Sequence, residues 1–194
     1  LTDRIAAAGE GEVIALDKDY TEAITIPAGA KITLDLAGKK LTSTTATVVT
    51  NNGDLTLTDS VGGGRIERTA QTGDTTGIRN NSGAVLKMEA GTIEVITVTS
   101  GTAVGIYNAG RITEIAGGEI LASTPGSTYA YGISNQGGTI DLISDGYVFG
   151  GITAFNKNGN NAMAINNGSN GTITSITGGV FVGSVRTGGG GYGI

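Results

Sequence analysis

Two carboxylates, Glu114 and Asp141, are the nearest candidates in this sequence for a catalytic acid pair. Glycoside hydrolysis ordinarily needs two positioned carboxylates. Elimination from a uronic acid would instead need acidic calcium ligands beside a basic residue. Glu114 and Asp141 occupy different positions of the repeating units defined below, and none of the positions that we compared holds acids in two neighbouring units. We therefore expect both to be solvated surface acids, and we predict no catalytic residues.

The residue types that most often perform catalysis or bind metals are missing from this chain. It has no His and no Cys, which excludes a Ser-His-Asp triad, a thiolate metal site and disulfides. The basic residues Arg79 and Arg111 are expected to be surface charges rather than catalytic bases. The sequence therefore predicts no metal site and no cofactor.

Charge and hydropathy limit the partners further. Twelve Lys and Arg residues against 17 Asp and Glu give a formal net charge of −5, which argues against a nucleic-acid-binding surface. No segment has the uninterrupted apolar length of a membrane span. We expect neither nucleic-acid binding nor membrane insertion.

The elements that would position any site recur along the chain. Lead isoleucines follow one another at steps of 28, 27, 32 and 29 residues: Ile78, Ile106, Ile133, Ile165 and Ile194. A period in this range is typical of a solenoid, in which each unit buries its apolar face by stacking on its neighbours. We therefore predict coils of about 27–32 residues.

The spacing inside each unit favours three short strands per coil. The first apolar residue is followed by others at +3 and +8, with a Gly at +6 that argues against a helix. Gly and Asn supply the backbone conformations that tight corners need. The residues predicted to form one continuous core are Val85, Met88, Ile93, Ile112, Ile115, Ile120, Ile140, Ile143, Val148, Ile173, Ile176 and Phe181. The pattern predicts an all-β fold, a single parallel β-helix domain over residues 1–194.

Asparagines recur at one corner of the unit, one or two positions after the lead isoleucines. They are Asn80, Asn108, Asn135 and Asn166. A residue two positions along a strand from an inward isoleucine also points inward, so their amides are expected to bond from coil to coil as a ladder. Asn166 follows its isoleucine by only one position, so Asn167 is the alternative member in that coil. The other interpretation is that these residues only form turns.

The two ends of the chain differ from the regular units. Residues 2–9 predict a short helix, with Thr2 or Asp3 as its N-cap and Gly9 ending it. Such a helix would cover the open end of the solenoid and its strand edges. The chain stops at Ile194, in the middle of a unit, and we therefore expect a fragment of a longer surface protein.

One apolar row is predicted on the outside of the coils. Leu121, Phe149 and Val182 stand one position after inward residues, so strand alternation turns them outward. Tyr147 lies near them on the same face. The row predicts a surface that binds a glycan or a protein, unless a long loop covers it or bulges reverse the two faces. The longest excursion, residues 153–163, is expected to be a polar surface loop.

The N-terminal segments Ala23-Ile24-Thr25-Ile26-Pro27-Ala28-Gly29 and Ile32-Thr33-Leu34-Asp35-Leu36-Ala37-Gly38-Lys39 resemble right-handed parallel β-helix domains of the pectate-lyase-like type. Later units, such as Tyr131-Gly132-Ile133-Ser134-Asn135, look like those of large secreted or wall-attached bacterial surface proteins. The resemblance implies an extracellular or cell-surface, adhesin-like protein. Relatives with activity are polysaccharide lyases and glycoside hydrolases.

Two functions follow from these patterns. The first is a non-enzymatic structural or adhesive module of a bacterial surface or secreted protein, whose partners would be carbohydrates or host or cell-surface proteins. The alternative is a polysaccharide lyase or glycoside hydrolase whose site lies partly beyond this sequence.

Overall fold

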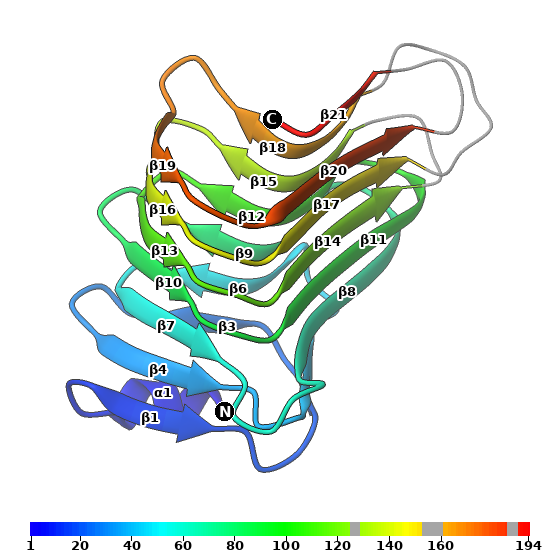
Figure 1. The fold of residues 1–194 in the computed structure, drawn as a ribbon. Helices are drawn as coiled ribbons and strands as arrows, with labels where there is room; N and C mark the ends of the chain where they lie inside the picture. Colours follow the sequence, from blue (N-terminus) through cyan, green and yellow to red (C-terminus); the bar gives the residue numbers. More distant parts are fainter. Residues whose placement is uncertain (125–128, 153–160, 186–189) are drawn as a thin grey trace.

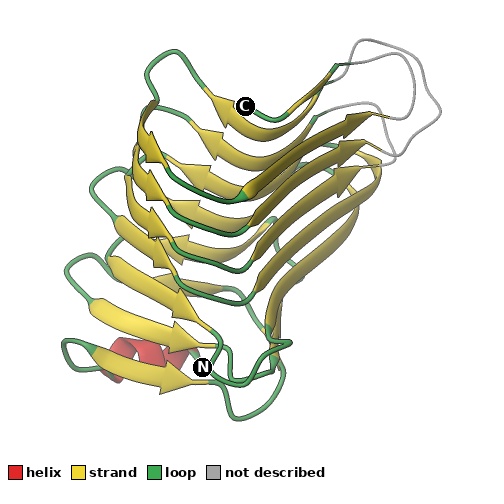
Figure 2. Ribbon diagram, in the orientation of Figure 1, coloured by secondary structure: helices red, strands yellow, loops and turns green. Residues whose placement is uncertain are grey.

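The protein is a parallel β-solenoid of three-strand coils (Figures 1 and 2). A computed structural model describes residues 1–124, 129–152, 161–185 and 190–194. Its strands form three sheets of seven, and every strand-to-strand pairing within them is parallel. The all-β solenoid is therefore as predicted. The predicted period describes the later coils, such as the 28 residues from Ile78 to its partner Ile106, whereas the first coils are shorter, with 20 residues from Glu12 to Ile32 and 23 from Lys31 to Asp54.

Each coil contributes one strand to each of three sheets, which we name A, B and C. Sheet A contains β1 (Glu12–Ala15), β4 (Lys31–Asp35), β7 (Asp54–Thr58), β10 (Val85–Met88), β13 (Arg111–Ile115), β16 (Thr139–Ile143) and β19 (Thr172–Ile176). Sheet B contains β2 (Tyr20–Thr21), β5 (Lys40–Thr42), β8 (Arg65–Thr72), β11 (Thr92–Ser100), β14 (Glu119–Thr124), β17 (Tyr147–Ile152) and β20 (Val180–Val185). Sheet C contains β3 (Ile24–Ile26), β6 (Thr47–Asn51), β9 (Thr75–Asn80), β12 (Ala103–Asn108), β15 (Ala130–Asn135), β18 (Ala162–Asn167) and β21 (Gly191–Tyr192).

The coil is right-handed. In Figure 1 the strands of sheet B run from left to right at the front, and those of sheet C return from right to left behind them as the chain climbs. Parallel strands joined by crossovers take this hand in nearly all proteins, because strand twist favours it.

The helix α1 (Thr2–Ala7) precedes the first coil, as predicted. Its Ile5 is 2 % exposed and belongs to the apolar core, so the helix covers that end of the solenoid. The predicted caps are wrong. The N-cap is Leu1, without a side-chain hydrogen bond, and the C-cap is Ala8, which has an extended conformation. Glu22 instead accepts hydrogen bonds from the backbone N–H (3.2 Å) and the hydroxyl (2.6 Å) of Thr2.

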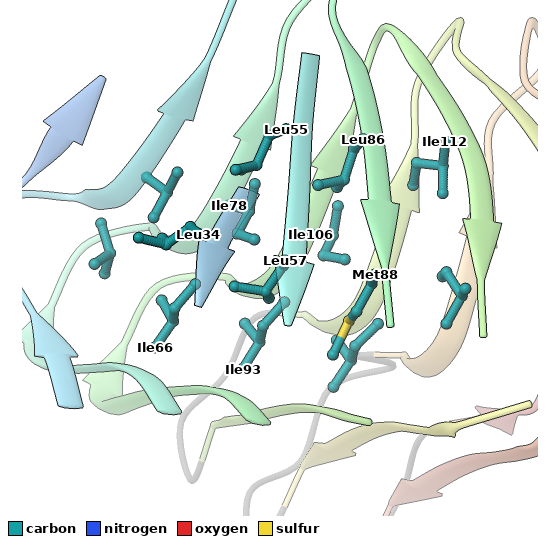
Figure 3. Close-up of a cluster of buried hydrophobic side chains, with 14 of the residues drawn as sticks. Leu34, Leu55, Leu57, Ile66, Ile78, Leu86, Met88, Ile93, Ile106 and Ile112 are labelled. Carbon is teal, nitrogen blue, oxygen red and sulfur yellow. The ribbon is translucent and has the colours of Figure 1, made fainter. Parts of the chain in front are cut away.

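The core is one stack of aliphatic side chains inside the three sheets (Figure 3). Eight of the twelve predicted core residues are buried: Met88, Ile93, Ile112, Ile115, Ile120, Ile140, Ile143 and Val148. Val85 is a correction. It is half-buried and pairs with Arg111, while Leu86 is fully buried and pairs with Ile112.

A β-bulge explains the error at Val85. The register between β10 and β13 shifts after Leu86, so that Lys87 pairs with Glu114 and Thr113 is the extra residue. The bulge stretches the inward spacing in β13 from two residues to three, because a bulged strand opposes two residues to one. Applying the +3 spacing to β10, which alternates regularly, selects Val85 in place of Leu86.

The last coil is less buried than predicted. Ile173 and Phe181 are partly buried against the core, and Ile176 is 40 % exposed. Strand β19 pairs with β16 on one side, and no described strand lies on its other side. Ile176 therefore belongs to the same row as Ile115 and Ile143 but lacks a covering coil.

This row gives a matched test of the fold. We expect Ile115→Asp to cost more than about 4 kcal/mol and to abolish cooperative folding, because it buries an unpaired charge. We expect Ile176→Asp, in the same row but exposed, to stay within about 1 kcal/mol of the parent. Urea melts followed by circular dichroism measure both. A soluble Ile115→Asp protein with a parent-like cooperative melt would contradict the register.

Candidate functional site

The predicted outward row lies on the outer face of sheet B. Leu121 of β14 pairs with Phe149 of β17, and Phe149 pairs with Val182 of β20. All three are half-buried, while the residues that precede them, such as Ile120 and Val148, are in the core. No bulge interrupts these pairings, so strand alternation turns the apolar row outward as expected.

A shallow hollow of about 320 Å³ lies over this row. It is lined by Glu94, Val95, Ile96, Leu121, Ser123, Tyr147 and Phe149. Three of the four predicted binding residues therefore share one hollow, and Val182 continues the row beyond its lining. Ile96 and Ser123 were missed. Ser123 stands two positions after Leu121, and Ile96, its partner in β11, stands two positions after Glu94, so both face the same way as the row.

The aromatic pair of the hollow is ordered by its own contact. The rings of Tyr147 and Phe149 are nearly parallel, at 9° between planes and 6.4 Å between centroids. Both project from β17 at alternate positions, so the strand fixes their spacing. Two parallel rings side by side present an apolar surface to a ligand.

Ion pairs form the polar side of the same face. Glu94 Oε2 accepts a hydrogen bond from Arg65 Nη1 at 3.0 Å across the β8–β11 pairing. One coil earlier, Lys40 Nζ lies 3.4 Å from Glu67 Oε2. A fixed carboxylate–guanidinium pair offers both acceptors and donors to a bound molecule, but it lacks the second carboxylate that acid–base chemistry on a sugar would need.

Glu114 and Asp141 lie on sheet A, away from the strands that build the hollow. Asp141 Oδ2 is 2.6 Å from Arg111 Nη2 and accepts a hydrogen bond from Arg111 Nε at 2.7 Å, a pair that raises the pKa of the guanidinium. Glu114 Oε1 accepts a hydrogen bond from Ser144 Oγ at 2.8 Å, and its Oε2 lies 3.5 Å from Lys87 Nζ. Each acid therefore has a local partner that links neighbouring coils.

The asparagines at the corner from sheet C to sheet A form a hydrogen-bonded ladder. Each side-chain amide donates to the Oδ1 of the next coil at 2.7–2.8 Å, in the order Asn51, Asn80, Asn108, Asn135 and Asn167. The first four are completely buried. The second amide hydrogen reaches a backbone carbonyl, as in the 3.3 Å bond from Asn108 to Thr139.

Asn167, and not Asn166, is the fifth member of the ladder. Asn135 pairs with Asn167 in the strand register, whereas Asn166 pairs with Ser134. Asn51, at the other end, was missed because its coil lacks the lead isoleucine and reads Val49-Thr50-Asn51 instead. The position two residues after Val49 is nevertheless the same position of the unit.

Glycine is required next to the ladder. A Cβ on Gly110 would lie 3.0 Å from the amide nitrogen of Asn80 and 2.4 Å from the carbonyl oxygen of Ala84. A Cβ on Gly138 would lie 2.4 Å from the amide nitrogen of Asn108. These glycines leave the space in which each amide reaches the coil above it.

One acid is buried, and its environment is structural. Asp35 is 7 % exposed, and its Oδ1 accepts hydrogen bonds from the backbone N–H groups of Ala37 and Ser60, each at 2.9 Å. Burial by itself would raise its pKa, but the hydrogen bonds from Ser60 and Ala37 outweigh burial and lower the pKa below its ordinary value. Asp35 therefore fastens the corners of two coils together as a carboxylate.

Within the described ranges, no group of three or more acidic side chains is placed to hold a metal ion. The described part of the chain also has no helix that is long and apolar enough to cross a membrane.

Comparison of the chain with protein-family models, with curated proteins and with solved structures finds no match. The parallel β-solenoid is therefore shown by the structure itself, and the pectate-lyase-like and adhesin-like identity stays a prediction.

The ladder predicts a difference between two asparagines. Asn108→Ala should lose on the order of 1–3 kcal/mol, because it leaves the buried amide groups of Asn80 and Asn135 without their partner. Asn166 stands at the same corner but outside the ladder, so the unfolding free energy of Asn166→Ala should stay within about 0.5 kcal/mol of that of the parent. Urea melts of the three proteins measure this. Equal losses would show that the ladder contributes nothing beyond turn formation. Asn158, in the polar loop predicted over residues 153–163, would be a further control, but it lies outside the described residues.

The buried carboxylate predicts a dependence on pH. The folded pKa of Asp35 lies below its unfolded value, so its contribution is present above the unfolded pKa of about 3.9 and is lost as the pH falls through the folded pKa. Asp35→Asn should therefore be less stable than the parent near pH 7, and the gap should narrow near pH 3. The exposed Glu10→Gln protein is the control. A gap that stays constant between the two pH values would contradict this role of the carboxylate.

Proposed function

We propose that this chain is a non-enzymatic, rigid module of a bacterial cell-surface or secreted protein, and that the outer face of sheet B binds carbohydrate. The observation that carries the proposal is the hollow in which Tyr147, Phe149 and Leu121 lie beside the Arg65–Glu94 pair. Small-molecule sites are typically apolar hollows with a few placed polar groups.

The chemistry of the hollow fits a sugar better than a purely apolar ligand. The flat rings of Tyr147 and Phe149 match the apolar C–H face of a pyranose, since aromatic side chains combine large contact area with a defined geometry. The Glu94 carboxylate can accept hydrogen bonds from sugar hydroxyls, and Ser123 offers a hydroxyl. A volume of about 320 Å³ is at the small end for ligand sites, which suits one or two sugar units.

The shape of the face supports binding to a chain of sugars rather than to an isolated one. The row continues past the hollow from Phe149 to Val182, along the axis of the solenoid. An extended glycan could therefore lie across several coils, each contributing an outward side chain of sheet B. The surface location rests on the resemblance of the repeats to those of bacterial surface proteins.

The enzyme alternative receives less support. Its two candidate carboxylates, Glu114 and Asp141, lie on sheet A in pairs with Lys87 and Arg111. Neither belongs to the residues that line the hollow on sheet B. A lyase or hydrolase acting in that hollow would have Glu94 as its sole lining acid among the described residues, and Glu94 is paired with Arg65.

The test is a glycan-binding measurement on the whole 194-residue chain. A labelled protein is applied to an array of pectin, glucan and host-type oligosaccharides, and hits are titrated by calorimetry. We expect Tyr147→Ala/Phe149→Ala to weaken binding roughly tenfold or more, because each ring contributes about 0.5–1.5 kcal/mol. Tyr107→Ala, an outward aromatic residue of sheet C, is the matched control and should bind like the parent.

Two outcomes would contradict the proposal. One is a failure of the binding site: the parent binds no glycan of the array, or the double variant binds glycan as the parent does. In the second case the double variant must melt at the same temperature as the parent. The other is product release by the parent, with or without calcium, that is lost in Glu114→Gln or Asp141→Asn. That second result would favour the enzyme.

A further inference from the structure

The outer face of sheet C is nearly free of charge. Within the strand bounds given above, the charged residue of sheet C is Arg79 alone. The strands of sheet A carry Glu12, Lys31, Asp35, Asp54, Lys87, Arg111, Glu114 and Asp141. The strands of sheet B carry Lys40, Arg65, Glu67, Arg68, Glu94 and Glu119. Since the whole chain has a net charge of −5, sheet C presents a distinct surface on an acidic protein.

Tyrosines occupy this face instead. Four of the six tyrosines of the chain lie on or beside its strands: Tyr107, Tyr129, Tyr131 and Tyr192. Val104, Tyr131, Met163 and Tyr192 form one row across β12, β15, β18 and β21. Tyr129 is 39 % exposed and Tyr192 is 49 % exposed, so the face is open to solvent at its rings.

Neighbouring side chains hold several of these rings in place. Tyr129 and Tyr131 stack at 5.6 Å between centroids and 14° between planes. The guanidinium of Arg79 lies 4.4 Å from the ring centroid of Tyr107, on the adjacent strand. Rings that are fixed before association lose less side-chain entropy when they become buried.

The composition of this face is that of a protein interface. Tyr, Met and Arg are enriched in the centres of such interfaces, whereas Lys, Glu and Asp are depleted. Sheet C carries the first group and lacks the second within its described strands. A polyanion would need several Lys or Arg residues and a metal ion several carboxylates, and the described strands of sheet C carry Arg79 alone.

The size of the face is close to what a stable complex needs. The seven strands have two to six residues each and 34 in all, so a spacing of about 4.8 Å and a rise of about 3.3 Å per residue give a face of roughly 540 Å². Two such faces packed together would bury roughly 1,100 Å², just above the value of about 1,000 Å² that a biological interface should clear.

We propose that the outer face of sheet C is the interface of a homodimer, formed by two copies of this chain packed face to face around a twofold axis. Two acidic copies repel each other least through the face with the fewest like charges. The middle strand of sheet C is β12. A twofold axis that runs along β12, between the two packed sheets, lays β12 over its own copy and β9 of one copy over β15 of the other, so that Arg79 lies opposite Ser134.

This arrangement also separates the two arginines. They lie on opposite sides of the axis, each one strand from it. Each is also one strand from β12 of the partner copy, whose Tyr107 stands at the same register as Arg79 and has a ring that can accept a cation. The hollow on sheet B stays open in the dimer, because it lies on a different face. The two proposals therefore stand or fall separately.

The experiment is sedimentation velocity and light scattering on the 194-residue chain from about 1 to about 100 µM, a range that covers transient and stable interfaces. We expect the parent to reach twice its 19.3 kDa. Tyr131→Lys should be monomeric over this range, because it buries a charge in the interface twice. Leu121→Lys makes the same change on the outer face of sheet B in the same coil, and it should stay dimeric.

Arg79→Ala provides a second variant that changes no buried residue, and it should weaken the dimer at least about fivefold. A parent that is monomeric throughout the range overturns the homodimer. A dimer that persists in both Tyr131→Lys and Arg79→Ala, or that dissociates as readily in Leu121→Lys, also overturns it, because the interface then lies elsewhere. Glycan binding by a monomeric parent would overturn the dimer and leave the carbohydrate proposal in place.

Discussion

The burial of a column of amides is the constraint on which the rest of the structure depends. A completely buried carboxamide must find hydrogen-bond partners, and inside a solenoid these come from the coils above and below. In this chain each amide donates to the next at 2.7–2.8 Å. Each coil must therefore place its asparagine directly beside that of the preceding coil. This requirement keeps the strands of successive coils in register in all three sheets.

Alignment at one corner determines the chemistry of three faces. Once the asparagines are in line, outward residues of successive coils also stand in line, so similar side chains can form rows along a face. Sheet A collects cross-coil pairs such as Arg111–Asp141, sheet B collects the apolar row of Leu121 and Phe149, and sheet C collects tyrosines. The faces can consequently serve different partners without sharing residues.

Features that repeat from coil to coil could be predicted from the sequence, whereas features that depend on a single coil could not. The period, the parallel solenoid, most of the core and the outward row on sheet B follow from residues that recur in four units. Val85 was wrongly assigned to the core because β13 contains a bulge that β10 does not have, so the inward residues of the two strands have different spacings. The exposure of Ile176 depends on which strands lie above it, which spacing within a unit does not express. The tyrosine face was missed because Tyr107, Tyr131 and Tyr192 stand at two different positions of the unit, and only the strand pairing shows that they share a surface.

The corners of the solenoid differ in how much the length of the connection between strands varies from coil to coil. From sheet A to sheet B the step is four residues in successive coils, from Met88 to Thr92, Ile115 to Glu119, Ile143 to Tyr147 and Ile176 to Val180. From sheet B to sheet C the step is variable, from Thr124 to Ala130 in one coil and from Ile152 to Ala162 in the next. Chain length there changes without moving an asparagine out of line. That edge is thus the place where evolution, or a protein engineer, can exchange whole peptide segments between the hollow and the tyrosine face while the scaffold keeps its geometry.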